Sequence, residues 1–382
     1  MRATKIVFWQ VCQSIHQAPY IRQLCAQVPD ARVLCVFSEG VSEERARMGW
    51  HTPDYGAAEL ICESDVSRMQ ELYLKHKCDA VHIFSSINSD SRLRAVFLAA
   101  TRSRPLAIGI FSEAYDRRGL KGLVRILRGL ILDRAHLKKI DFALCVGPKA
   151  VDWYTDMGVA SEKLFPFCYV VESSGPHNAN EDVSLEGEFE ITFVGVLVKR
   201  KNLLRSVWEL SKLRHLDWRL TIIGEGPQGL LLQVFVRLLG LSRRIRIRGF
   251  VDNHTARQVI RSSDLLLLPS KWDGWGAVIN EALSSGVPVL CSDYCGASDL
   301  IHNGFNGSVF RLDQAGSLLK RLDASIAGGK LTSDKREQIQ EWSACIRGDA
   351  VAAYLLEILG HVERSGESQG PKAAWKRRPQ TT

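Results

Sequence analysis

The sequence predicts an α/β protein built from two doubly wound domains. Short apolar runs alternate with helical patterns in both halves of the 382-residue chain. Such alternation is typical of parallel sheets with helices on both faces. A polar, acidic segment rich in turn residues, 173–188, separates the two series and is the best candidate for a linker. Because the strands of such sheets present their carboxyl ends at one edge, we expect the two domains to face a central cleft.

The first domain is expected over residues 1–172 and the second over residues 189–346. The expected strands of the first domain are 5–12, 32–37, 80–84, 106–111, 142–146 and 165–167. Those of the second domain are 190–195, 218–224, 245–250, 264–269 and 287–291. A C-terminal helix is expected within 347–364, followed by a basic, disordered tail over 365–382.

The composition excludes several classes of protein. With 46% apolar and 24% charged residues, the chain is too apolar to be mainly disordered. No window contains the ~18 consecutive apolar residues of a membrane span, and the first apolar run, IVFW, is too short for a signal peptide. The ten cysteines form no CxxC pair and are typical of reduced thiols. We therefore expect a cytoplasmic protein.

The positive charge is concentrated in patches. Residues 117–139 hold eight basic residues and one acid, and they are expected to form an amphipathic helix. Its basic side carries Arg118, Lys121, Arg125 and Arg128. Such a helix can lie on the inner face of the cytoplasmic membrane or bind a phosphate-bearing lipid, whereas the alternative is an ordinary helix whose apolar face is core. No aromatic residue interrupts the window, which argues against a nucleic-acid partner.

Two carboxylates mark the strongest candidate site. The loop KWDGWG, after the expected strand 264–269, carries Asp273, and the helix expected over 277–285 carries Glu281. Backbone N–H groups at the start of this helix suit anionic or hydroxyl-rich ligands. The alternative is that Asp273 caps the helix and Glu281 complements its dipole.

These residues resemble the carboxylate-x7-Glu signature of family 4 (group 1) glycosyltransferases of the bacterial polysaccharide and glycolipid type. Asp273-Gly274-Trp275-Gly276 stands where Glu-Gly-Phe-Gly is usual, and Asn280-Glu281-Ala282 follows at the family's spacing. The resemblance extends to FVGVLVKRKN, LTIIGEGP, IRGFVDN, SSDLLLLPS and GASDLIHNGFNG, in that order along the chain. It implies the twin Rossmann-like arrangement called GT-B.

The same resemblance implies a retaining, metal-independent enzyme that transfers a sugar from a nucleotide-sugar to a glycolipid or polysaccharide acceptor in bacterial cell-surface glycan synthesis. It implies no cofactor beyond the donor. The lack of an Asp-x-Asp triplet and of clustered His/Cys ligands is consistent with no metal. The implied catalytic residues are Asp273, Glu281, Arg200, Lys201 and, in the first domain, Glu113.

The resemblance also assigns binding positions. Those for the donor are Gly195, Lys199, Gly224, Glu225, Gly226, Phe250, Val251, Gly274, Trp275, Gly276, Ala277 and Val278. The acceptor is expected in the first domain, near His16 and the basic helix. Two alternatives stay open there: Glu113 can be a surface carboxylate paired with Arg117, and His16 can be incidental.

Three other functions remain open. The segment GEGPQG satisfies the G-x-G-x-x-G fingerprint and follows a strand, which would indicate an NAD(P)-dependent oxidoreductase. A sugar-nucleotide epimerase would have the same fold. A non-catalytic sugar-binding or scaffold protein is the third, because Asp273 replaces the usual Glu and Val196 stands where many relatives have Arg.

Overall fold

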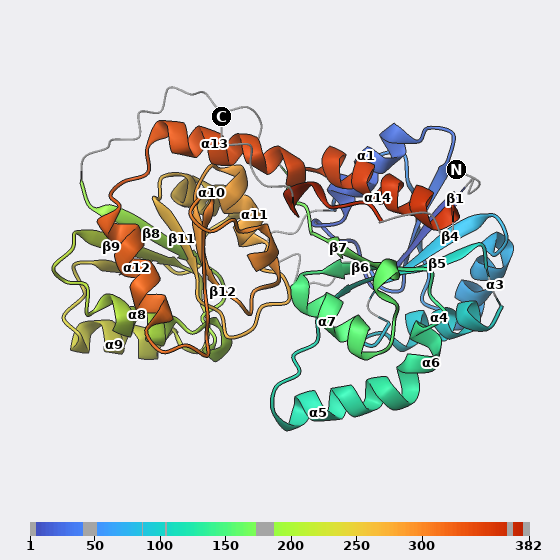
Figure 1. Cartoon of the computed structure of the whole chain (residues 1–382), viewed down its shortest axis with the longest axis horizontal. Coiled ribbons are helices and arrows are strands. Elements are labelled where there is room, and N and C mark those ends of the chain that lie inside the picture. The colour runs from blue at the N-terminus through green and yellow to red at the C-terminus, as the bar shows by residue number, and fades with distance from the viewer. Residues whose placement is uncertain are drawn as a thin grey trace. The chain divides into compact units, whose positions relative to one another are not determined.

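The computed structural model describes residues 5–40, 52–85, 87–103, 105–172, 187–364 and 370–376 (Figure 1). The chain divides into two compact units. Of the described residues, unit 1 holds those up to Glu172 together with those from Cys345 onward, and unit 2 holds those from 187 to Ala344. Each unit has its own parallel sheet and its own core.

The sheet of unit 1 has seven parallel strands in the order β3-β2-β1-β4-β5-β6-β7. The strands are β1 (Lys5–Gln10), β2 (Arg32–Phe37), β3 (Glu59–Cys62), β4 (Ala80–Ser85), β5 (Ala107–Glu113), β6 (Phe142–Val146) and β7 (Leu164–Phe167). The order reverses between β1 and β4, which is the point where doubly wound sheets usually bind ligands. Strand β4 is buried along its whole length, including its two polar residues, His82 and Ser85.

Helices cover both faces of this sheet. They are α1 (Ala18–Gln27), α3 (Val66–His76), α4 (Ser91–Ser103), α6 (Arg134–Leu137), α7 (Pro148–Asp156) and α14 (Gly348–Glu363). The last of these packs against α1, so the C-terminal helix completes unit 1. Aromatic rings fill the core: Trp9 stacks on Phe84 with ring centres 5.7 Å apart.

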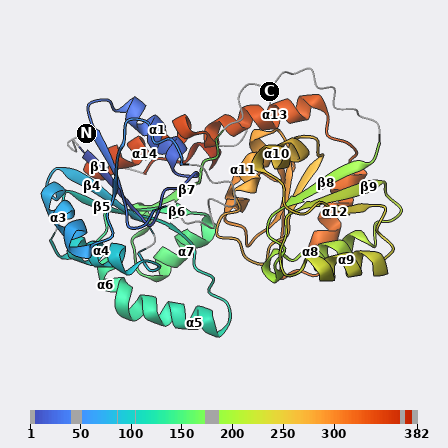
Figure 2. The ribbon, with the colours of Figure 1, turned by 180° about the vertical axis from the view of Figure 1, so that it is seen from behind.

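The basic window forms helix α5 (Gly119–Arg128), which continues through a π-helical turn, Gly129–Asp133, into α6. Both views show α5 standing away from the sheet of its own unit (Figures 1 and 2). Only Gly122 of α5 is buried, whereas Leu120 is 84% exposed and Val124 64% exposed. The alternative that its apolar face belongs to the core is therefore wrong.

The sheet of unit 2 has six parallel strands in the order β10-β9-β8-β11-β12-β13. These are β8 (Phe189–Val194), β9 (Trp218–Ile223), β10 (Ile245–Ile247), β11 (Leu265–Leu268), β12 (Val289–Ser292) and β13 (Gly307–Phe310). The helices are α8 (Leu203–Leu210), α9 (Gly229–Leu238), α10 (Asn253–Arg261), α11 (Val278–Ser284), α12 (Ser317–Ala327) and α13 (Ser333–Trp342). Again the order reverses beside the first strand, here between β8 and β11.

The prediction of two doubly wound α/β domains is confirmed, and the cleft between them stays a prediction. Two edge strands were not predicted, β3 and β13. Strand β3 is exposed or half-exposed at every residue, and β13 begins at a glycine, so neither has a buried apolar run. Most of the predicted linker, residues 173–186, lies outside the described residues.

The expectation of a disordered tail over 365–382 is wrong for residues 370–376. This segment ends in a short turn, Ala374–Lys376, and buries Trp375 completely. The ring of Trp375 lies 5.6 Å from that of Tyr354 on α14. The prediction was wrong because it relied on the basic composition of the tail and gave no weight to its single tryptophan. Among the described helices, none has both the length and the apolar character needed to cross a bilayer.

Candidate functional site

A buried ion pair joins the two loops that flank the reversal point of unit 2. The Nζ atom of Lys201, in the turn after β8, lies 2.5 Å from the Asp273 carboxylate, in the loop after β11. The two side chains are 10% and 13% exposed. Arg200 lies 3.9 Å from the same carboxylate and donates a hydrogen bond to the Trp272 carbonyl at 3.2 Å. Two cations thus share one carboxylate at the carboxyl ends of adjacent strands, which leaves positive charge available for an anion.

The glycines after β8 and β9 let two loops pack backbone against backbone. A Cβ atom on Gly224 would lie 2.1 Å from the Gly195 carbonyl oxygen, and one on Gly226 would lie 2.7 Å from that of Leu197. The Leu197 amide also donates to the Glu225 carbonyl at 2.7 Å. The room that these glycines leave is therefore occupied by the chain itself, and a dinucleotide is not needed to explain GEGPQG. The oxidoreductase alternative is not favoured.

The loop after β11 is held by a second segment, the one that follows β12. The amide of Gly296 donates to the Asp273 carbonyl at 3.1 Å, and the amide of Asp273 donates to the Tyr294 carbonyl at 3.0 Å. A Cβ atom on Gly296 would lie 2.0 Å from the Gly274 carbonyl oxygen, so only glycine fits there. Gly276 has a φ of +92°, a conformation that also favours glycine. The backbone of this loop is consequently fixed before any ligand arrives.

The side chain of Trp275 is buried within unit 2 and is therefore not available to a ligand. It is 3% exposed, and its indole N–H donates to the Asn280 side-chain oxygen at 2.8 Å. Its predicted donor role can therefore come only from its backbone. Ala277 caps α11 and Val278 begins it, so the predicted helix start is correct to within one residue.

Glu281 lies in the first turn of α11 and is partly buried. Burial raises the pKa of this carboxyl above its ordinary value, and the positive charge of Arg257 acts in the opposite direction. Glu225, after β9, accepts a hydrogen bond from the Phe250 amide at 3.2 Å. The ring of Phe250 is 59% exposed, and its neighbour Val251 is half-buried.

The predicted acceptor residues lie in unit 1. Glu113 is the last residue of β5, where its carbonyl accepts a hydrogen bond from the Ser112 hydroxyl at 2.9 Å. Arg117, the alternative partner of Glu113, pairs with Asp156 instead. The ring of His16 lies 5.7 Å from that of Tyr169.

The basic residues on and next to helix α5 also lie in unit 1. Arg118 and Arg125 both bond to Asp116, the first through its carboxylate and the second through its carbonyl. Lys121 and Arg128 are exposed on α5.

Three residues of unit 2 were missed by the sequence analysis. Ser270 is fully buried, with its hydroxyl 3.5 Å from the Asp273 carboxylate. Gly296 locks the loop that carries Asp273. Both belong to segments that resemble the family, so the signal was present but no role was assigned. Arg257 acts on Glu281 from α10, and no local pattern indicates this.

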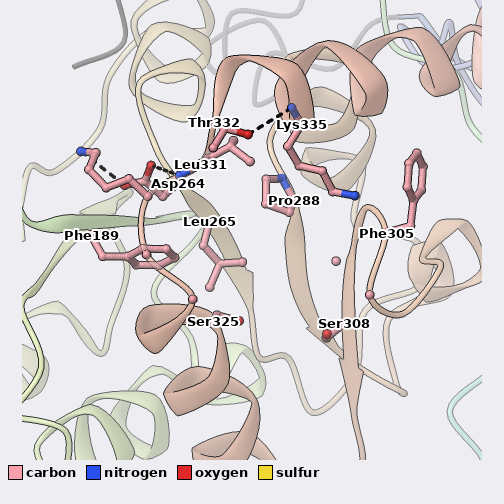
Figure 3. Close-up of a pocket in the computed structure, with 15 residues that line it drawn as sticks. Phe189, Asp264, Leu265, Pro288, Phe305, Ser308, Ser325, Leu331, Thr332 and Lys335 are labelled. Carbon is pink, nitrogen blue, oxygen red and sulfur yellow. Dashed lines mark hydrogen bonds and ion pairs between the residues drawn. The ribbon is translucent and has the colours of Figure 1, made fainter. Parts of the chain in front are cut away.

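A pocket of about 500 Å³ lies at the other edge of the same sheet. Its lining includes Phe189, Leu265 and Gly307, which begin strands β8, β11 and β13 (Figure 3). Asp264 there accepts a hydrogen bond from the Leu331 amide at 3.0 Å. None of the predicted site residues lines this pocket. Separately, among the described residues no group of three or more His, Cys, Asp or Glu side chains could hold a metal ion.

Solved structures share this architecture. The apo form of the lipopolysaccharide outer core galactosyltransferase WaaB matches with a TM-score of 0.67 and 16% identity, over 94% of this chain and 99% of that one. HepE of Anabaena, in complex with UDP, matches with a TM-score of 0.66 and 15% identity, over 94% and 100% of the two chains. The chain therefore has the GT-B fold with its two Rossmann-like domains.

The family match is confined to the part of the chain that carries the ion pair. The model of the family described as glycosyl transferases group 1 matches residues 177–342. A lipopolysaccharide 1,6-galactosyltransferase of Salmonella typhimurium is 30% identical over 115 residues, which are 29% of this chain and 32% of that protein. The alignments with the first curated relatives cover 32% and 45% of those relatives' lengths.

Proposed function

We propose that this protein is a retaining glycosyltransferase that moves a sugar from a nucleotide-sugar to a bacterial glycolipid or polysaccharide acceptor. The observation that carries the proposal is the buried Lys201–Asp273 pair, with Arg200 beside it, at the carboxyl ends of β8 and β11. The match of residues 177–342 to the group 1 glycosyltransferase family supports it. The names of the relatives that act on lipopolysaccharide support the class of acceptor.

In this proposal, unit 2 binds the donor. Breaking the bond between sugar and diphosphate leaves negative charge on the departing phosphate, and fixed cations stabilise that charge in the transition state. Arg200 and Lys201 supply the cations, with Lys199 next to them. Asp273 and the backbone of Gly274 to Val278 hold the sugar, and the Glu281 carboxyl accepts hydrogen bonds from the ribose hydroxyls. The reaction needs no metal, because these side chains supply the charge.

The acceptor binds unit 1. Glu113, at the end of β5, assists deprotonation of the acceptor hydroxyl. The exposed leucines and basic residues of α5 hold the protein on the anionic inner face of the cytoplasmic membrane, where a lipid-linked acceptor would lie. The exposure of the apolar side of α5, with Ile131 just beyond it 76% exposed, supports this role.

The first test is a thermal-shift panel of UDP, GDP, ADP, CMP, NAD and NADP, measured with EDTA and again with Mg²⁺. A ligand at about 100 times its dissociation constant adds about 2.7 kcal/mol to stability, which corresponds to a shift of about 2–4 °C. We expect one nucleoside diphosphate to stabilise the protein equally with and without Mg²⁺. Glu281→Ala should abolish the shift, and the matched variant Glu341→Ala, at an exposed position of α13, should keep it.

Two outcomes would contradict the proposal. A shift with NAD or NADP alone would make the protein a dinucleotide-binding enzyme. No shift with any nucleotide, together with no sugar transfer to a membrane extract, would favour the non-catalytic alternative. A shift that needs Mg²⁺ would overturn metal independence only.

A further inference from the structure

Helix α9 of unit 2 is apolar on both sides, and one of them is exposed. Leu232 and Val236 face the core, where they are 1% and 4% exposed. On the other side the exposed fractions are 75% for Leu230, 52% for Leu231, 42% for Val234 and 79% for Leu238. A helix with apolar side chains on two sides is normally buried on both, so a second surface is expected to cover the exposed side of α9.

The exposed leucines form one continuous face. Leu230, Val234 and Leu238 follow one another at intervals of four residues and therefore lie along one side of the helix, next to Leu231. Gln233 and Arg237 are the polar residues within α9. Both views place α8 beside α9 at this part of unit 2 (Figures 1 and 2), and α8 exposes Trp208 to 46%.

Basic residues surround the C-terminal end of α9. Arg214 donates a hydrogen bond to the carbonyl of Leu239, the residue that caps the helix. Arg244 donates to the carbonyls of Arg214 and Leu216 and lies over the Trp218 ring at 5.4 Å. Arg237 in the last turn and Arg243 just after the helix are exposed. One acidic residue, Asp217, lies in the turn just before β9.

This charge extends along the sequence around the helix. Residues 199–248 contain twelve Lys or Arg and three Asp or Glu, a net charge of +9 in a chain whose total is +8. One of the acids, Glu209, is already paired with both Arg205 and Lys212. Lys201 pairs with Asp273 and Arg219 with Glu188, two acids outside this window. The exposed basic residues near the leucines of α9 are therefore Arg214, Arg237 and Arg243.

We propose that this α9 face, formed by Leu230, Leu231, Val234, Leu238 and the exposed Arg214, Arg237 and Arg243, sits on the surface of an anionic lipid bilayer. Leucines enter the boundary between headgroups and acyl chains, and the arginines pair with lipid phosphates. A second copy of the chain fits less well, because a symmetric contact would place the same arginines against each other. The contact is separate from that of α5, since it belongs to unit 2, and it does not depend on sugar transfer.

The test is cosedimentation of the full chain with lipid vesicles in the absence of donor and acceptor. Vesicles of phosphatidylcholine alone are compared with an equal mixture of phosphatidylcholine and phosphatidylglycerol. The α9 variant is Leu230→Gln with Leu238→Gln, and it is made both in the natural chain and in a chain that also carries Leu120→Gln and Leu127→Gln in α5. The matched control is Leu74→Gln, an exposed leucine (62%) on α3 of unit 1.

We expect the α9 variant to lower the partition coefficient on anionic vesicles about tenfold in both backgrounds, as loss of buried apolar area requires. Leu74→Gln should have no effect, and thermal unfolding checks that each variant is folded. Unchanged binding by the α9 variant, or equal binding to neutral vesicles, would overturn the proposal. Light scattering that shows a dimer converted to a monomer by Leu230→Gln with Leu238→Gln would assign the face to a second copy instead.

Discussion

The central strands of the two units end differently, although both sheets are parallel and doubly wound. In unit 2, β8 and β9 run into Gly195 and Gly224, and the loops that follow pack through their backbones. In unit 1, β1 ends at Gln10, whose amide donates to Gln17 at 2.7 Å, and β4 ends at Ser85, whose hydroxyl donates to the Trp9 carbonyl at 2.9 Å.

The difference separates two ways of building a strand end. The glycine loops after β8 and β9 carry the short patterns FVGVLVKRKN and LTIIGEGP, so each can be recognised in the sequence although the two loops pack against each other. Side chains such as Gln10 instead depend on partners that are distant along the chain, including the Tyr55 hydroxyl at 3.4 Å. Under the proposed function, the glycine loops of unit 2 bind the diphosphate that many donors share, whereas the side chains at the strand ends of unit 1 can differ for each acceptor.

Replacement of Lys201 is the most direct test of the loop that follows β8 in unit 2. Lys201→Ala removes one fixed cation and leaves the Asp273 carboxylate with Arg200 at 3.9 Å. We expect sugar transfer to fall about 100- to 1,000-fold, as for loss of one preorganised donor to a developing anion. Initial rates at saturating donor measure this, with Lys320→Ala, exposed on α12, as the matched control. A loss of less than tenfold would remove Lys201 from the catalytic residues.

A pair of glycine variants separates close packing from conformational freedom. Gly224→Ala would place Cβ 2.1 Å from a backbone oxygen at a φ of +133°, whereas Gly240→Ala has a φ of +65° and no atom within 4 Å. We expect losses in the free energy of unfolding of about 3 kcal/mol or more at Gly224 and about 1 kcal/mol at Gly240. Denaturant titration measures both. Equal losses would show that the contact between the two loops contributes little.

Replacement of His82 tests how the side-chain contacts in the core of unit 1 contribute to stability. His82 is fully buried, accepts a hydrogen bond from the Trp9 indole N–H at 3.1 Å, and lies 4.9 Å from the Tyr73 ring. Burial lowers its pKa to about 4.

Because the unfolded chain binds this proton near pH 6.5 and the folded chain does not, stability is lost as the pH falls from about 6.5 to 4. The expected loss is about 3 kcal/mol. In His82→Gln this contribution should vanish from the pH dependence of denaturant unfolding. A variant with the slope of the natural protein would assign the pH dependence to other groups.

The smallest expected effect concerns Glu113. Glu113→Gln should lower kcat about 100-fold, because it removes a general base. It should leave the nucleotide-induced thermal shift unchanged, because the residue belongs to unit 1. A change in the shift with no change in kcat would contradict an acceptor role. Asp156→Asn, which breaks the nearby pair with Arg117, is the matched control.

How well each element could be predicted depends on whether the contacts that fix it are made by residues close together in the sequence. The buried strands β2 and β6 were predicted with the correct ends because each is a continuous apolar run. Asp273, Arg200 and Lys201 were singled out through the resemblance to the family, and in the structure these three residues lie together. The part played by Gly296 was missed, since its reason is a contact with Gly274 across 22 residues of chain. The exposure of α9 was likewise not predicted, because an apolar helical pattern does not say whether another surface covers it. For α5 the sequence left open an exposed helix on a membrane and a core helix, and its apolar side is exposed.

The path of the chain makes unit 2 an insertion in unit 1. The chain leaves unit 1 at Glu172 and returns at Cys345, and the returning α14 packs against α1 near the start of the fold. Unit 2 is therefore one uninterrupted piece of chain that can be excised, whereas a fragment that stops at residue 172 lacks the helix that covers α1. During synthesis, unit 1 can close only after the ribosome has completed the whole of unit 2. The domain that begins first is thus the one that finishes last.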